Sequence, residues 1–200
     1  MFAGSMKPFG YAVLSALLLV GALPGRAAAQ DDHMQSMMQD PMTMADAHQS
    51  SALVAAVRAA TERFKDPRVA QAEGYGLLFG CVSNDTAGAM GMHFVNPSLA
   101  FDGGQLDVAH PEIILYEPLP GGKLRITGAD YLVLAQDWDA KHPGNPPQLM
   151  GQLFHYFASP NRFGLPPFYT LHVWAWKDNP NGTFTNWNPT VPCDAFSGQQ

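Results

Sequence analysis

The spacing of apolar residues predicts two helices over residues 51–74. In the first helix apolar side chains recur at intervals of three and four with charged residues between them, which is typical of a helix with one buried face. These apolar positions are Leu53, Val57, Ala60 and Phe64. Asp66 followed by Pro67 begins the second helix, with aspartate at the N-cap and proline at the first helical position. Gly74 predicts its end.

After Gly74 the pattern changes to short apolar runs separated by glycine and proline, as in an antiparallel sheet. Five strands are expected, over residues 77–82, 90–95, 112–117, 124–134 and 169–176. A turn over residues 118–122 joins two of them into a hairpin. Residues 135–147 and 158–167 are expected to be loops that are long enough to carry function.

Helices followed by strands predict an α+β fold, with two N-terminal helices packed on an antiparallel sheet that can curl into a barrel. A chain of 200 residues is of the size of one domain. We expect residues 51–200 to form that domain. Residues 30–50 are polar and rich in Met, Gln and Asp, and we expect them to be a flexible linker.

The N-terminal segment has a different pattern. Lys7 precedes an apolar run over residues 11–23, and small residues follow at 27–29. This arrangement predicts a secretory signal peptide over residues 1–29. The apolar run is shorter than the roughly 20 residues of a membrane span. We therefore expect an exported protein, periplasmic or extracellular, without a stable membrane span after cleavage.

Charge narrows the class of partner. The chain carries 11 Lys and Arg against 17 Asp and Glu, a formal charge of −6. The expected signal peptide holds Lys7 and Arg26 and no acidic residue, so its removal makes the charge −8. Such an acidic chain is not expected to bind nucleic acid, which needs clustered cations.

The two cysteines, Cys81 and Cys193, both follow the expected signal peptide. An even number of cysteines in an oxidising compartment predicts one disulfide bond. The alternative is a catalytic thiol, which a disulfide would consume.

A methionine-rich tract in the expected linker is a candidate copper site. Its thioether and imidazole residues are His33, Met34, Met37, Met38, Met42, Met44 and His48. Thioether sulfur suits Cu(I), and imidazole suits Cu(II). The alternative is a spacer whose methionines absorb oxidants.

Two histidines in expected strands, His93 and His172, are a second candidate site. Strand alternation places His172 on the same face as Thr170. Glu112 and Glu117 lie on opposite faces of a third strand, so only one of them could join the histidines. Two imidazoles and a carboxylate can hold zinc, iron or manganese. Their spacing matches no metal motif, and the alternative is a pair of hydrogen-bonded core histidines.

Aromatic residues offer a third option. Alternation places Trp174 and Trp176 on the face of His172, and with Trp187 they could stack against a sugar. The favoured interpretation is that these side chains fill the core. The sequence contains no nucleophile elbow, phosphate loop or dinucleotide fingerprint, so the catalytic residues are unknown.

Three segments together resemble a family of exported bacterial proteins: MGMHFVN over residues 90–96, LYEP over 115–118 and LHVWAW over 171–176. The resemblance covers roughly residues 51–196. No activity is attached to that family, so the resemblance implies an exported protein and no catalytic residues.

We therefore expect an exported domain that binds a metal ion or a small ligand. The alternatives are a metal-dependent enzyme that uses the same residues with a metal-bound water, and a periplasmic copper-binding protein that uses the methionine-rich tract. A structural protein of the envelope is a further alternative. Separation of the His93 and His172 rings beyond about 8 Å would exclude a metal between them.

Overall fold

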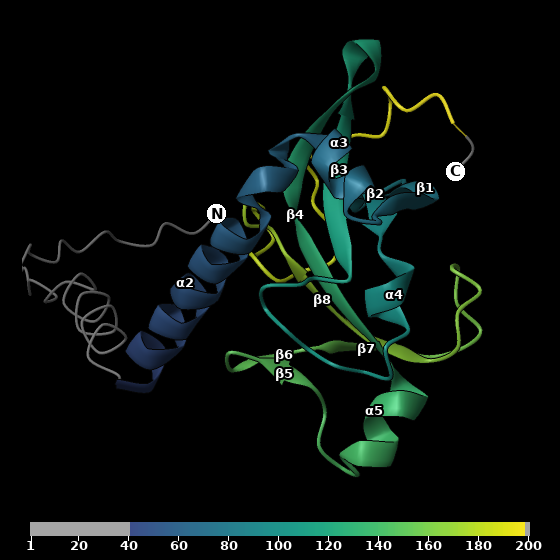
Figure 1. Ribbon diagram of the computed structural model, residues 1–200. Coiled ribbons are helices and arrows are strands. Elements are labelled where there is room, and N and C mark those ends of the chain that lie inside the picture. The colour runs from purple at the N-terminus through teal and green to yellow at the C-terminus, as the bar shows by residue number, and fades with distance from the viewer. Residues whose placement is uncertain (1–40, 199–200) are drawn as a thin grey trace, which may run out of the picture. The chain divides into compact units, whose positions relative to one another are not determined.

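The computed structural model describes residues 41–198, and for residues 41–49 and 51 it describes the backbone alone (Figure 1). The expected signal peptide and the linker residues 30–40 lie outside this part. No described helix is sufficiently long and apolar to cross a membrane.

Three helical segments open the described part: α2 (Pro41–Thr61), the 3-10 turn η1 (Glu62–Lys65) and α3 (Pro67–Ala72). The start of α3 is as expected, since the Asp66 carboxylate accepts a hydrogen bond from the backbone N–H of Arg68. The start of α2 differs from expectation, because residues 41–50 are helical and not a flexible linker. Pro41 suits a first helical position, and the Met, Ala and Gln residues that follow have good helix propensity.

The strands form a six-stranded antiparallel sheet in the order β1-β2-β3-β4-β8-β7. Its strands are β1 (Gly76–Asn84), β2 (Gly88–Val95), β3 (Ile113–Leu119), β4 (Lys123–Leu134), β7 (His155–Phe157) and β8 (Phe168–Val173). The five expected strands are all present, and the short β3–β4 connection is the 3-10 turn η2 (Pro120–Gly122). The α+β prediction is confirmed.

Other short elements lie outside the sequence expectations. They are α4 (Pro97–Ala100), α5 (Ala135–Lys141) and a small hairpin of β5 (Gln148–Leu149) and β6 (Gln152–Leu153). The prediction of a loop over residues 135–147 was therefore wrong for its first half, which is helical. Residues 158–167 do form a loop between β7 and β8.

Both faces of the sheet are covered, because alternate residues of its central strands belong to different cores. Ile114 and Tyr116 of β3 pack with Phe64 of η1, and Tyr131 of β4 packs in the same cluster as Leu53 of α2. Ile113 and Leu115, which alternate with them, pack with Leu132 and Phe168 on the opposite face. Figure 1 shows α2 and α3 beside the central strands. The face turned away from these helices holds the candidate site.

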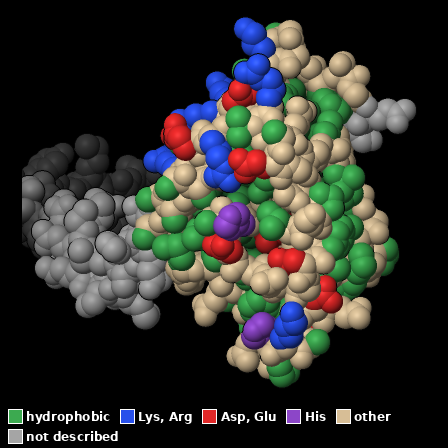
Figure 2. Space-filling model, in the orientation of Figure 1, with side chains coloured by type: hydrophobic (Ala, Val, Ile, Leu, Met, Phe, Trp, Pro, Cys, Tyr) green, Lys and Arg blue, Asp and Glu red, His purple; other side chains and the backbone are tan. Residues whose placement is uncertain are grey.

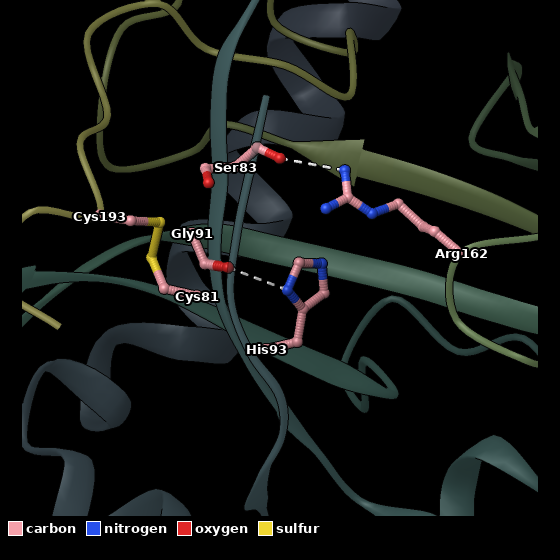
Figure 3. The surroundings of a disulfide bond; sticks show 6 residues. All are labelled: Cys81, Ser83, Gly91, His93, Arg162 and Cys193. Carbon is pink, nitrogen blue, oxygen red and sulfur yellow. Dashed lines mark hydrogen bonds between the residues drawn. A yellow bond between two sulfur atoms is a disulfide. The ribbon is translucent and has the colours of Figure 1, made fainter. Parts of the chain in front are cut away.

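The predicted disulfide is present and joins Cys81 of β1 to Cys193 near the C-terminus (Figure 3). It links two segments 112 residues apart in the sequence. The described part contains no free cysteine, which removes the alternative of a catalytic thiol.

Lysine and arginine side chains gather at the upper end of the view in Figure 2, where Figure 1 draws α3 and the β3–β4 hairpin. Here the buried Glu117 carboxylate pairs with Arg125 and with Lys177, the latter at 2.6 Å. Arg63 pairs with Glu73 at 2.9 Å. These cations therefore have acidic partners within the fold.

Candidate metal centre

His93, Asp130 and His172, which we call the triad, come together on the face of the sheet turned away from the helices. Asp130 of β4 pairs directly with His172 of β8. His93 stands on β2, with β3 and β4 between it and β8. In a flat sheet three strand spacings amount to about 14 Å. The two imidazole rings are only 5.8 Å apart, because the sheet curls around this face.

The triad has the geometry of a preformed ligand set. Each residue offers one ligating atom, and these atoms all lie within 4.8 Å of one another. Nδ1 of His172 and Oδ1 of Asp130 are 3.3 Å apart. Two ligands at about 2.0–2.2 Å from a tetrahedral ion stand about 3.4 Å apart, so this pair already has the right separation. The third ligand, from His93, must move about an ångström closer to this pair to bind the same ion.

His93 has its ring orientation fixed by the backbone of its own strand. Its Nδ1 lies 3.1 Å from the carbonyl oxygen of Gly91 (Figure 3). A carbonyl can only accept, so Nδ1 carries the proton and Nε2 keeps its lone pair. Metal-bound histidines are typically held by such a hydrogen bond from their other nitrogen. Gly91 has φ +89°, and an added Cβ would lie 2.5 Å from the backbone oxygen of Tyr116, so this position requires glycine.

His172 is the least satisfied polar side chain of the site. It is 2% exposed, and neither of its ring nitrogens makes a hydrogen bond within the described part of the chain. The nearby Asp130 oxygen lies at contact distance without the alignment of a hydrogen bond. Buried polar atoms without a partner are rare, because each costs about 1–3 kcal/mol. A ligand that accepts the imidazole lone pair would relieve this cost.

Asp130 is held by β8. One of its carboxylate oxygens accepts a hydrogen bond from the hydroxyl of Thr170, and the backbone of Leu171 also contributes a hydrogen bond. Its side chain is almost fully buried. Hydrogen bonds of this kind hold a ligating carboxylate in a fixed orientation.

Burial shifts the pKa of each triad residue toward its uncharged form. Burial raises the pKa of Asp130 to about 6, against the opposing effect of His93 and the Thr170 hydrogen bond. Burial and the neighbouring His172 lower the pKa of His93 to about 4. Burial, with a smaller effect of His155, lowers the pKa of His172 to about 3. Both histidines are thus neutral near pH 7, the form in which imidazole binds a metal.

A small cavity adjoins the triad, and we call it the site cavity. Its walls are the triad, Thr170 and otherwise apolar side chains. The aromatic ones are Phe79, Phe157, Phe163 and Phe168. The volume open to the centre of a water molecule is about 20 Å³, which is on the order of one or two water positions.

The two glutamates proposed from the sequence are not part of this site. Glu117 pairs with Arg125 of β4 and with Lys177. Glu112 is buried, and its Oε2 accepts a hydrogen bond from the backbone N–H of Leu132 at 3.0 Å. Neither carboxylate belongs to the cluster that contains the histidines. Glu117 stands on β3 and Glu112 directly precedes that strand, whereas the register pairs His172 with β4.

Asp130 is the residue that the sequence reasoning missed. Its signal was present, because it is the only charged residue between Gly128 and Leu134, an otherwise apolar part of a strand. A charged side chain in a buried strand usually has a specific partner. The expected pairing of His172 and Thr170 on one face is confirmed, since both line the site cavity.

The tryptophans proposed as a sugar-binding platform lie outside the strand that carries His172. β8 ends at Val173, so strand alternation does not extend to the tryptophans. Trp174 belongs to the core beside the helices, and Trp176 donates a hydrogen bond to Thr61 of α2 at 2.9 Å, which agrees with the favoured core interpretation.

Of the methionine-rich tract, His33, Met34, Met37 and Met38 precede the described residues. The side chains of Met42, Met44 and His48 also lie outside the described part.

The donor set suits a divalent transition metal. Imidazole binds zinc, iron, nickel and copper, and carboxylate oxygen also suits manganese. Two neutral imidazoles and one carboxylate leave a bound divalent ion with a net charge of +1. Three protein ligands also leave at least one coordination position for a further group. Comparison of the chain with family models, curated proteins and solved structures finds no match.

Proposed function

We propose that this protein is an exported metal-binding protein that holds one divalent transition metal ion between His93, Asp130 and His172. The observation that carries the proposal is the convergence of three ligating atoms within 4.8 Å in a buried site. The two ring nitrogens of His172 without a hydrogen bond support it, because a structural core histidine would have a partner.

Export is the second part of the proposal. The sequence pattern of residues 1–29 is that of a signal peptide, and the Cys81–Cys193 bond is typical of an oxidising compartment. Fractionation of a bacterial culture that expresses the full chain tests this part. We expect a processed form about 29 residues shorter outside the cytoplasm, and full-length protein confined to the cytoplasm would contradict it.

Titration of the metal-free protein with Co(II) tests the metal site. Cobalt replaces zinc or iron in such sites and reports its ligands by visible absorption. We expect one Co(II) per chain and absorption bands of a low-coordinate ion. The His172→Ala and Asp130→Asn variants should each lose these bands.

His110→Ala and His142→Ala are the matched controls, because both histidines are exposed and neither belongs to the triad. They should bind Co(II) as the unchanged protein does. Equal binding by the His172→Ala variant, or no binding by the folded protein, would refute the proposal.

A further inference from the structure

The site cavity carries an inference about what binds at the metal. We propose that the open coordination position of the triad takes a small uncharged molecule of the size of dioxygen and excludes larger or anionic ligands. This inference rests on the proposed metal site and deepens it.

The size of the site cavity limits the ligand. About 20 Å³ is open to the centre of a water molecule, so the cavity beside the triad has room for on the order of one or two atoms of that size. A substrate of the size of an amino acid or a sugar needs a cleft of about 300 Å³ or more. The described cavity therefore admits a ligand of diatomic size and no typical organic substrate.

The lining of the site cavity is largely apolar. Apart from the triad and Thr170, every side chain that lines the cavity is apolar, and the Thr170 hydroxyl already donates to Asp130. No lysine or arginine of the described chain is among the lining residues. An anion at the metal would lose its hydration without gaining a hydrogen-bond donor from the lining residues. An uncharged diatomic ligand does not meet this cost.

Two phenylalanine rings, of Phe79 and Phe163, form part of the cavity wall. Phe163, in the 158–167 loop, is half-buried and stands 5.3 Å from Phe79 and 6.5 Å from His93 between ring centroids. Phe79 has φ 67°, a strained conformation for a bulky residue, within an irregular stretch of β1. Both rings belong to the wall of the cavity, so their size limits which ligands fit.

The loop that carries Phe163 is also tied to β1. Arg162 donates a hydrogen bond to the backbone oxygen of Ser83 at 3.0 Å, which Figure 3 shows above His93. This hydrogen bond holds the loop that carries Phe163 against the strand that carries Phe79. The donor set agrees with the inference, because two histidines and one carboxylate with open positions are the ligands that non-haem iron uses for dioxygen.

The experiment uses the full chain loaded with Fe(II) under anaerobic conditions, with bound iron measured first and nitric oxide as the dioxygen-sized probe. We expect the half-integer-spin EPR signal of a ferrous nitrosyl, close to one per bound iron. Azide should fail to displace nitric oxide, because it is larger and anionic. Absence of bound iron and of every other divalent metal would overturn both the proposed function and this inference.

If metal binds and the nitrosyl signal is absent, the inference falls while the proposed metal site stands. Displacement of nitric oxide by azide would refute the size and charge selection. Phe163→Ala should admit imidazole at the Co(II) form and strengthen its binding by about tenfold or more, as expected when a wall that excludes a ligand is removed. Phe101→Ala is the control, because Phe101 is 58% exposed and does not line the cavity.

Should Phe163→Ala fail to fold, Phe163→Leu serves as the milder variant, and the nitric oxide and azide results on the unchanged chain decide the inference by themselves. Imidazole binding that is the same in the Phe163 variant and the unchanged protein would contradict the assigned role of this wall.

Discussion

At the scale of single residues, two buried threonines of neighbouring strands have opposite environments. Thr170 of β8 donates a hydrogen bond to Asp130 and lines the site cavity. Thr127 of β4 is equally buried, and its hydroxyl has no hydrogen-bond partner in the described part. Only the first hydroxyl orients a triad ligand, so the two residues form a matched pair for substitution.

Thr170→Val should weaken metal binding by about 10–100-fold, because the Asp130 ligand loses the hydrogen bond that orients it. The Thr127→Val control should bind metal normally. It should be as stable as the unchanged protein or more so, since it removes an unsatisfied buried hydroxyl. Competition against a chelator measures the affinity, and urea unfolding measures the stability. Equal metal affinity of the two variants would contradict the role of Thr170.

Glu112 gives a second prediction at this scale, for the pH dependence of stability. Burial raises the pKa of Glu112 to about 8 from the model-peptide value of 4.5, although the Leu132 N–H lowers it in part. The folded state therefore binds the proton more tightly than the unfolded state. Between about pH 4.5 and pH 8 this group makes the free energy of unfolding fall as pH rises, by at most about 1.4 kcal/mol per pH unit.

Glu112→Gln should remove this contribution and keep an acceptor for the Leu132 N–H. The loss of stability between about pH 5 and pH 7.5, measured by urea unfolding, should be smaller than in the unchanged protein. The buried histidines act in the opposite direction in both proteins, because their lowered pKa values make stability rise with pH. An identical pH profile for the variant would contradict the raised pKa of Glu112.

At the scale of elements, the curl of the sheet brings β2 to β4 and β8. An irregularity in the β3–β4 register falls where Leu115 pairs with Gly128 and Tyr116 pairs with Ile126. Gly128 also packs directly against the backbone oxygen of Val173 in β8, where an added Cβ would overlap it. This close approach lies two residues from Asp130, so it helps to place the ligand against His172.

Gly128→Ala should destabilise the protein by about 1–3 kcal/mol, as overpacking does, and should also weaken metal binding. Gly76→Ala is the control, since an added Cβ at this β1 position meets nothing within 4 Å. Urea unfolding and Co(II) titration of both variants give the two quantities. If the Gly128 variant is destabilised but binds metal as the unchanged protein does, the close approach of Gly128 to Val173 does not position the triad.

Most of the helices and strands could be predicted from the sequence. Apolar alternation and Gly/Pro punctuation located the five long strands, because strand patterns depend on neighbouring residues. α5 was missed, since its sequence AQDWDAK carries too short a pattern to distinguish a helix from a loop. β5, β6 and β7 were missed because two or three residues carry no periodicity.

Only part of the candidate site could be predicted from the sequence. His93 and His172 were identified as polar residues within expected strands. Their rings were expected to lie within about 8 Å of each other if they share a metal, and they are 5.8 Å apart. The third ligand was assigned to β3 and not β4, because sequence alternation gives the face of a side chain but not the order of strands in the sheet. The register of β4 against β8 is what selects Asp130.

At the scale of the whole molecule, the N-terminal helices cover one face of the sheet, and the triad occupies the other. The Cys81–Cys193 bond ties the C-terminal segment to β1, the edge strand whose Phe79 walls the site cavity. The bond thus supports the fold near the site without taking part in metal binding.

Replacement of both cysteines by serine should lower the free energy of unfolding by about 2–5 kcal/mol, because the unfolded chain loses its cross-link. Metal should still bind at low denaturant concentration, since neither cysteine belongs to the triad. Guanidinium unfolding with and without reductant checks the stability, and the reductant should have no effect on the variant. A variant as stable as the oxidised protein would contradict the structural role of the bond.

The central claim is that a metal ion binds between His93, Asp130 and His172. X-ray absorption at the zinc edge of the full chain, loaded with one Zn(II), tests it most directly. The account predicts two imidazole ligands and oxygen ligands at about 2.0–2.2 Å, without sulfur. A shell that contains sulfur would place the ion on the methionine-rich tract, and a shell of oxygen alone would place it on surface carboxylates; either result would contradict the account.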